Sequence, residues 1–210
     1  MLSEWRNFFI FDSVERIPNI LSASRILLAP LFFYLYLQDA VILAVLGMVV
    51  FIFAAITDYV DGYYARRYDV SSSLGKFLDP LADKILTFAG FICLPFIDAA
   101  QFPWWIIGII VFRDIFVTGM RVWADHTGWS MRTLYSAKVK TLVQMVFLYI
   151  ALLVGVLVKA GGAVGELSQM LLQSGMLGWL FLLVMIVTVY TGFEYIWINR
   201  RLFVRESKKA

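Results

Sequence analysis

Long apolar runs separated by short polar stretches dominate the pattern of this chain. A membrane-spanning helix needs about 20 consecutive, mostly apolar residues, and six runs qualify or nearly qualify. They cover residues 19–38, 41–63, 77–98, 103–124, 136–158 and 176–198. The pattern therefore predicts an all-α integral membrane protein with six transmembrane helices.

The connections between these runs are short, except for residues 159–175, which read "KAGGAVGELSQMLLQSG". We predict a loop-like stretch there. The spacing of Gly161 and Gly165 matches the GxxxG pattern of packed membrane helices. Because the pattern falls in a predicted loop, we assign it no role in helix packing.

The two ends of the chain differ from the membrane domain, which we place at residues 18–200. Residues 1–17 mix Trp, Phe and Ile with charges, which is typical of a short amphipathic helix lying on the membrane surface. An ordered extension with packing duties alone is the alternative. Residues 201–210 form a basic tail that we expect to lie against anionic lipid.

The placement of Lys and Arg predicts how the chain is oriented, because cytoplasmic loops of membrane proteins carry the excess of these residues. With both termini in the cytoplasm, that side holds Arg6, Arg16, Arg66, Arg67, Lys76, Arg132, Arg200, Arg201, Arg205, Lys208 and Lys209. The opposite side holds Asp39, Asp98, Glu166 and one basic residue, Lys159. We therefore expect both termini at the cytoplasmic side.

Composition narrows the classes of function. Of the 210 residues, 61% are hydrophobic and 16% are charged, whereas soluble domains carry about a quarter charged residues. Nucleic-acid binding is a poor explanation for the net charge of +3 in so apolar a chain. A single cysteine, Cys93, and a single histidine, His126, exclude a zinc or iron centre built from several such ligands.

Four aspartates stand at the ends of the second and third apolar runs. Asp58 and Asp61 are three residues apart, and Asp79 and Asp83 are four apart. On helices, both spacings put the two carboxylates on one face. A tight turn between antiparallel helices would bring the two pairs together at the cytoplasmic boundary of the membrane.

Such a cluster repels itself and is costly to desolvate, so it needs a cation. Oxygen ligands without His or Cys favour a hard divalent ion, Mg²⁺ or Mn²⁺. Two ions about 4 Å apart can hold the attacking and leaving oxygens of a phosphoryl displacement. Interfacial charges solvated by water and lipid headgroups are the alternative interpretation.

The residues between the aspartates fit a site that approaches a phosphate closely. Gly62 and Gly75 remove side chains where a ligand or a neighbouring helix must come near. Ala65 is also small, and Arg66 carries a planar fork of donors suited to phosphate.

The whole stretch resembles the signature of the CDP-alcohol phosphatidyltransferase family. It reads Asp58-x2-Asp61-Gly62-x2-Ala65-Arg66-x8-Gly75-x3-Asp79-x3-Asp83. The resemblance implies a six-helix enzyme, usually a homodimer, with an active site open to the cytoplasm. Such enzymes transfer a phosphatidyl group from a CDP-linked lipid to an alcohol and release CMP.

The resemblance also implies roles for these residues. Asp58, Asp61, Asp79 and Asp83 would hold two metal ions, and Asp83 would also be the general base for the acceptor hydroxyl. The residues implied for binding the CDP-lipid are Asp58, Gly62, Ala65, Arg66 and Gly75.

Basic residues inside or at the ends of the apolar runs point to an anionic acceptor, because buried cations need anionic partners. We predict that its phosphate is bound by Arg25, Arg113, Arg121, Lys138 and Lys140. Arg113 and Arg121 are eight residues apart, so both point roughly the same way on a helix. Pairing of Arg113 with Asp114 or Asp125, and snorkelling of the outer three to headgroups, are the alternatives.

Residues 17–150 resemble the bacterial branch of that family that uses glycerol 3-phosphate. The likeness lies in "IPNILSASRILLAP", "FRDIFVTGMR" and "YSAKVKT", although the branch often has Glu at position 114 and Gly at position 137. It implies CDP-diacylglycerol and glycerol 3-phosphate as substrates, at a bacterial inner membrane. The alternatives are inositol phosphate, serine or phosphatidylglycerol as acceptor, an intramembrane prenyltransferase, and a divalent-cation channel.

Overall fold

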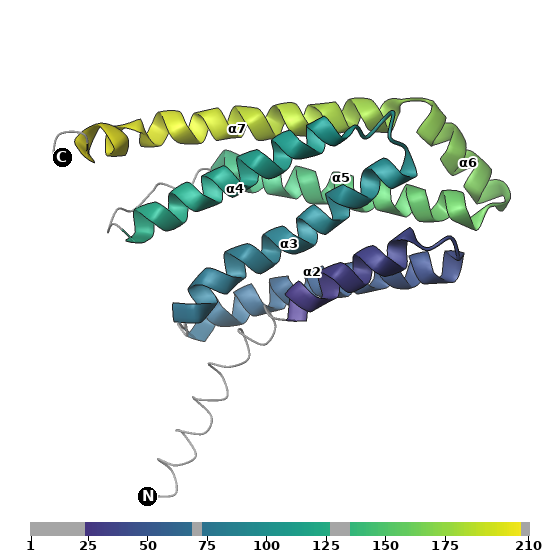
Figure 1. The fold of residues 1–210 in the computed structure, drawn as a ribbon, viewed down its shortest axis with the longest axis horizontal. Coiled ribbons are helices and arrows are strands. Elements are labelled where there is room, and N and C mark those ends of the chain that lie inside the picture. The colour runs from purple at the N-terminus through teal and green to yellow at the C-terminus, as the bar shows by residue number, and fades with distance from the viewer. Residues whose placement is uncertain (1–23, 69–72, 127–134, 207–210) are drawn as a thin grey trace, which may run out of the picture. The chain divides into compact units, whose positions relative to one another are not determined.

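A computed structural model describes the backbone of residues 24–68, 73–126 and 135–206, and the side chains of 24–57, 84–124 and 135–200. Within these residues there are seven helices and no strand. They are Ser24–Leu37, α2 (Val41–Tyr68), α3 (Ser73–Ile97), α4 (Trp104–His126), α5 (Tyr135–Ala160), α6 (Gly162–Gln173) and α7 (Met176–Glu206) (Figure 1). The prediction of an all-α protein is confirmed.

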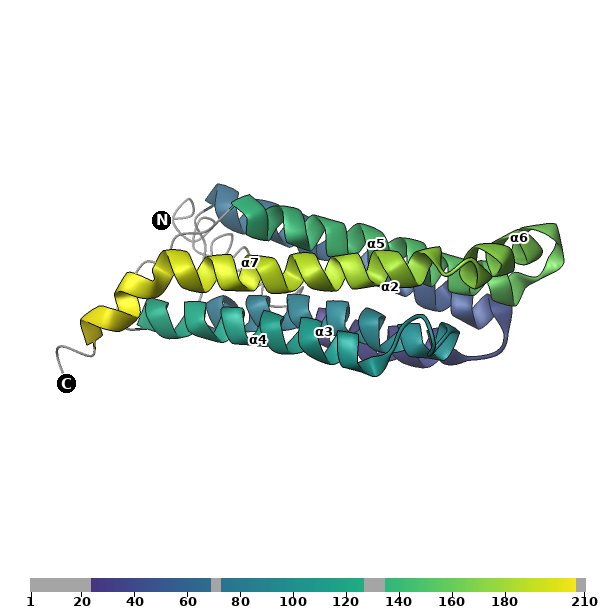
Figure 2. The ribbon, with the colours of Figure 1, turned by 90° about the horizontal axis from the view of Figure 1, so that it is seen from above.

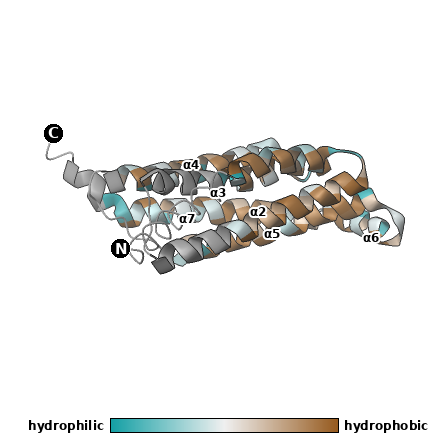
Figure 3. Cartoon of the chain, turned by 90° about the horizontal axis from the view of Figure 1, so that it is seen from below, coloured by the Kyte–Doolittle hydropathy of each residue, from teal (hydrophilic) through white to brown (hydrophobic). Residues whose placement is uncertain are grey.

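Each of the six apolar runs coincides with a helix. Two helices of the described chain are long and apolar enough to cross a membrane, Tyr135–Ala160 and Met176–Arg200, and Ser24–Leu37, Val41–Thr57 and Lys84–Ile97 are shorter apolar stretches. Large hydrophobic side chains also face outward, among them Leu27, Phe112 and Trp179, each at least 70% exposed. Figure 3 shows hydrophobic residues along most of the described helices. This exterior suits lipid and indicates a membrane protein.

The predicted loop at 159–175 is wrong, because α6 occupies most of it. Positive φ angles at Gly161, Gly162 and Gly175 make the turns at its two ends, a conformation that glycine adopts without steric cost. Gly165 also has the packing role that the sequence analysis denied it. A Cβ at Gly165 would lie 3.1 Å from the carbonyl oxygen of Leu157, so the close approach of α6 to the end of α5 requires glycine.

The chain forms two compact units, and the first comprises residues 1–93. In it, Ser24–Leu37 and α2 pack as a helical hairpin around Phe32 and Phe51, whose ring centroids lie 4.7 Å apart. A Cβ at Gly47 would lie 2.8 Å from the backbone nitrogen of Tyr36. Glycine at this position therefore allows the two helices to pack backbone against backbone.

In the second unit, residues 94–210, α7 contacts α4, α5 and α6. Figure 2 shows α7 lying beside α4, with α6 at one end. The aromatic core consists of Phe102, Phe147 and Phe181, with the rings of Phe147 and Phe181 stacked at 5.4 Å. This core fixes the register of α5 against α7.

Gln101 ties the turn before α4 to the start of α7. Its side-chain amide donates to Asp98 and to the carbonyl of Leu172, and its oxygen accepts from the backbone N–H of Gly178. At the other end of α4, the Arg121 guanidinium lies 5.9 Å from the ring centre of Tyr195. The two contacts show that α4 and α7 run in the same direction.

Candidate functional site

The aspartate signature lies on two helices, as predicted. Asp58, Asp61, Gly62, Ala65 and Arg66 belong to α2, and Gly75, Asp79 and Asp83 belong to α3. The side chains of these eight residues lie outside the described residues, so their meeting around a metal stays a prediction, as does the amphipathic helix at 1–17.

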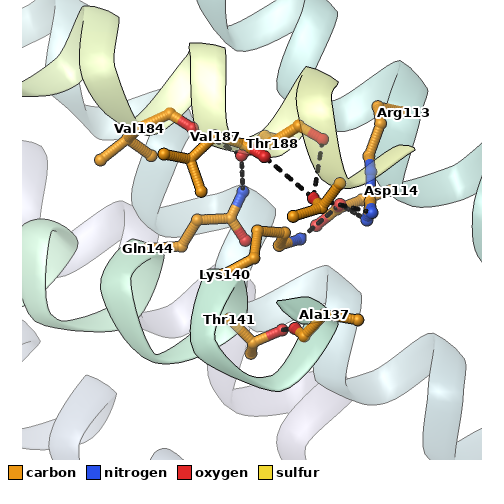
Figure 4. A network of polar contacts seen from close by, with 10 residues as sticks. Arg113, Asp114, Ala137, Lys140, Thr141, Gln144, Val184, Val187 and Thr188 are labelled. Atoms are coloured by element: carbon orange, nitrogen blue, oxygen red, sulfur yellow. Dashed lines mark hydrogen bonds and ion pairs between the residues drawn. The ribbon is translucent and has the colours of Figure 1, made fainter. Parts of the chain in front are cut away.

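A second polar cluster is fully described and lies within the second unit (Figure 4). Its centre is Asp114 of α4, whose Oδ1 accepts from Lys140 Nζ of α5 at 2.6 Å and from Arg113 Nη1 at 3.0 Å. Asp114 and Lys140 are each 2% exposed. Arg113 and Lys140, two of the predicted phosphate-binding residues, are therefore brought together on one carboxylate oxygen.

Helix α7 completes the cluster with two threonines. Thr191 Oγ1 accepts from Arg113 Nη2 at 3.1 Å, and Thr188 Oγ1 accepts from Gln144 Nε2 at 3.0 Å. Each threonine donates its own proton to a carbonyl on α7, one turn back. A hydroxyl has one donor and two acceptor lone pairs, so this back-bonding aims the lone pairs at the neighbouring helices. We call Arg113, Asp114, Lys140, Gln144, Thr188 and Thr191 the buried network.

Two of the other predicted basic residues, Arg121 and Lys138, lie outside the buried network. Both are exposed, and Arg121 stacks over Tyr195. Within the second unit, the structure therefore brings together Arg113 and Lys140 out of four predicted residues. The fifth, Arg25, is 1% exposed and belongs to the first unit.

The charges of the buried network do not cancel. Arg113 and Lys140 share one carboxylate, that of Asp114, which leaves one positive charge in excess among these three groups. Arg113 also has a buried Nε that makes no hydrogen bond among the described residues. Buried charge in an apolar surrounding is costly, and an anion such as a phosphate would offset it. The alternative pairing of Arg113 with Asp114 is confirmed.

Sequence reasoning missed Gln144, Thr188 and Thr191. The available signal was their polarity, since each stands within an apolar run where polar residues usually mark function or packing. Their pairing with residues on other helices had no signal in the local sequence.

Comparison with known proteins places these features in a family. The family model described as CDP-alcohol phosphatidyltransferase matches residues 15–191. A protein of Bacillus subtilis (strain 168) named CDP-diacylglycerol–glycerol-3-phosphate 3-phosphatidyltransferase is 36% identical over 142 residues, 62% of this chain and 72% of that protein. A Rickettsia bellii protein of the same name is 31% identical over 183 residues, 86% of this chain and 93% of that protein.

A third relative carries a different name. A probable cardiolipin synthase (CMP-forming) of Drosophila melanogaster is 42% identical over 109 residues, 51% of this chain and 32% of that protein. The family match covers most of the chain and includes both the aspartate signature and the whole buried network. The chain therefore belongs to the CDP-alcohol phosphatidyltransferase family.

Proposed function

We propose that this protein transfers the phosphatidyl group of CDP-diacylglycerol to glycerol 3-phosphate, releasing CMP and forming phosphatidylglycerol phosphate. The observation that carries the proposal is the complete eight-residue signature of the family on α2 and α3. The names of the Bacillus and Rickettsia relatives support this donor and acceptor. The two cations of the buried network, Arg113 and Lys140, support an acceptor that bears a phosphate.

The four aspartates of the signature offer carboxylate oxygens as metal ligands, and such ligands favour a hard divalent cation. Asp58, Asp61, Asp79 and Asp83 would hold the metal, which we propose to be two ions of Mg²⁺ or Mn²⁺. Bound there, the metal would neutralise the charge of the diphosphate and of departing CMP. Asp58, Gly62, Ala65, Arg66 and Gly75 bind the CDP-lipid in this proposal.

The chemical step is a displacement at the β-phosphorus. Asp83 takes the proton of the 1-hydroxyl of glycerol 3-phosphate, and that oxygen forms a bond to the β-phosphorus. The bond from the β-phosphorus to the oxygen shared with the α-phosphate breaks, and CMP leaves with its electron pair. Positioning and electrostatics supply most of the catalysis in such transfers.

Arg113 and Lys140 bind the phosphate of the acceptor in this proposal, with Arg25, Arg121 and Lys138 as further cationic groups. Arg113 retains donors beyond its two hydrogen bonds to Asp114 and Thr191, since a guanidinium carries five N–H groups.

The remaining parts of the proposal concern the membrane. We propose that six transmembrane helices cross a bacterial inner membrane. As the distribution of Lys and Arg predicts, both termini and the active site lie at its cytoplasmic face. Support comes from the bacterial relatives and from the apolar helices. We also propose a homodimer in contact with membrane lipids.

The deciding experiment measures CMP release by the purified protein from CDP-diacylglycerol, with each acceptor in turn. Release that requires glycerol 3-phosphate and a divalent cation is expected. Release with phosphatidylglycerol instead would favour the second candidate, cardiolipin synthesis, which the Drosophila relative suggests. No CMP release with any acceptor would contradict both.

A further inference from the structure

Two residues of α7, Thr191 and Gly192, adjoin the side chain of Arg113 and have no role in the signature. Thr191 Oγ1 accepts from Arg113 Nη2 at 3.1 Å. A Cβ at Gly192 would lie 3.1 Å from both Cγ and Nε of Arg113. Thr191 thus binds the guanidinium of Arg113, and Gly192 leaves room for the Cγ and Nε atoms of the same side chain.

The orientation of the Thr191 hydroxyl is set by hydrogen bonds within α7 and does not depend on Arg113. Its proton goes to the carbonyl of Val187 at 2.9 Å or to that of Thr188 at 3.0 Å, and the residue is 3% exposed. Because the proton is committed to its own helix, the oxygen can only accept from Arg113. The guanidinium is planar, so holding Nη1 on Asp114 and Nη2 on Thr191 fixes the plane of the whole group.

We propose that Thr191 and Gly192 are positioning residues that fix the Arg113 guanidinium for the acceptor phosphate. Without them, Asp114 would still hold one nitrogen of Arg113, but the plane would rotate about that contact. Arg113 would then meet the phosphate with poorer alignment, while the affinity for the CDP-lipid would not change. This inference rests on the proposed function, because it gives Arg113 the acceptor phosphate as its ligand.

The test compares Thr191→Val with Thr141→Val in the full chain. Valine keeps the shape of threonine and removes the hydroxyl. Thr141 is the matched control, because the hydrogen bond described for its hydroxyl goes to the carbonyl of Ala137 on its own helix. Steady-state CMP release gives the KM for glycerol 3-phosphate, the KM for CDP-diacylglycerol and kcat for each variant.

We expect Thr191→Val to raise the KM for glycerol 3-phosphate about tenfold, the worth of one charge-assisted hydrogen bond. The KM for CDP-diacylglycerol should stay unchanged, as should both constants in Thr141→Val. Thr191→Ser restores the acceptor oxygen and should restore the KM. Gly192→Ala should raise the same KM by less, because the arginine stem must shift only by tenths of an ångström.

The outcomes separate the two proposals. Wild-type protein that releases no CMP in response to glycerol 3-phosphate overturns the proposed function and this inference with it. Active wild-type protein, with Thr191→Val equal to Thr141→Val, overturns the inference alone. An equal rise in the KM for both substrates, or a KM that Thr191→Ser does not restore, would show that Thr191 serves only the packing of the helices.

Discussion

The aspartate signature and the buried network differ in which charged and polar groups they contain and in how far apart these groups lie along the chain. The signature gathers four carboxylates within residues 58–83, on two helices that follow one another. The buried network joins cations, a carboxylate, an amide and hydroxyls from α4, α5 and α7, and its longest link spans 78 residues. The signature is rich in hydrogen-bond acceptors, and the buried network is rich in donors.

This difference indicates that the two regions have different functions. Carboxylates at fixed spacing can share a cation with the diphosphate of a lipid, and they have little affinity for a second anion. The buried network already contains its own counter-charge in Asp114, so it keeps a fixed geometry and a modest positive excess. We infer that the signature serves the reacting diphosphate and that the network serves the acceptor.

Removal of divalent cations should have the largest effect. In the presence of a chelator, the signature loses the charge that offsets its four carboxylates, and we expect CMP release to fall to background. The buried network has no need of a metal, so the free energy of unfolding of the second unit should hardly change. Restoring excess Mg²⁺ or Mn²⁺ should return the activity, and full turnover in a chelator would contradict the metal proposal.

The substitution Asp83→Asn should have the second-largest effect on activity. Removing a general base lowers turnover about 100- to 10,000-fold, and we expect kcat for CMP release to fall by that much while binding of CDP-diacylglycerol largely survives. Asp39→Asn is the matched control, since Asp39 is an exposed carboxylate in the connection before α2. Turnover at the wild-type rate would remove Asp83 from the role of base.

The helices were largely predictable from the sequence, because the length and apolarity of a run are local properties. Residues 136–158 and 176–198 were predicted, and α5 and α7 contain them. The exception is α6, because the four glycines in and beside it are typical of a loop. They lie at its ends and at its contact with α5, and only the packed structure distinguishes these roles from flexibility.

The candidate site was predictable only in part, for the same reason. The signature depends on spacing along one stretch of sequence, so its residues could be read directly. The contact of Arg113 with Thr191 depends on how α4 packs against α7, and no local pattern reports that packing. Phosphate binding by Arg113 and Lys140 was predicted, but their shared contact with one oxygen of Asp114 was not.

Asp114→Asn should show how far the buried network depends on its one carboxylate. The change removes the carboxylate that Arg113 and Lys140 share, and breaking a buried ion pair costs about 3–5 kcal/mol. We expect the free energy of unfolding in mixed micelles to drop by that amount and the KM for glycerol 3-phosphate to rise. Glu166→Gln on the exposed face of α6 is the control.

A second change separates stability from binding in that experiment. Adding Lys140→Met to Asp114→Asn removes one of the two cations that Asp114 binds, so the free energy of unfolding should recover. Binding of the acceptor should not recover, because a donor for its phosphate has also gone. Recovery of both properties would mean that Lys140 acts only as the partner of Asp114.

The smallest effect is expected at the far end of the buried network, where Gln144 donates to Thr188. Side-chain hydrogen bonds between membrane helices contribute about 0.6 kcal/mol on average. A double-mutant cycle with Gln144→Leu and Thr188→Val, measured by unfolding in mixed micelles, should give a coupling energy near that value. Among the described hydrogen bonds, neither residue pairs with Arg113, so neither change should alter the KM for glycerol 3-phosphate. A change in that KM comparable to the one expected for Thr191→Val would show that the binding function extends along the whole network. The contacts of Arg113 and Asp114 predict instead that it ends with Lys140 and Thr191.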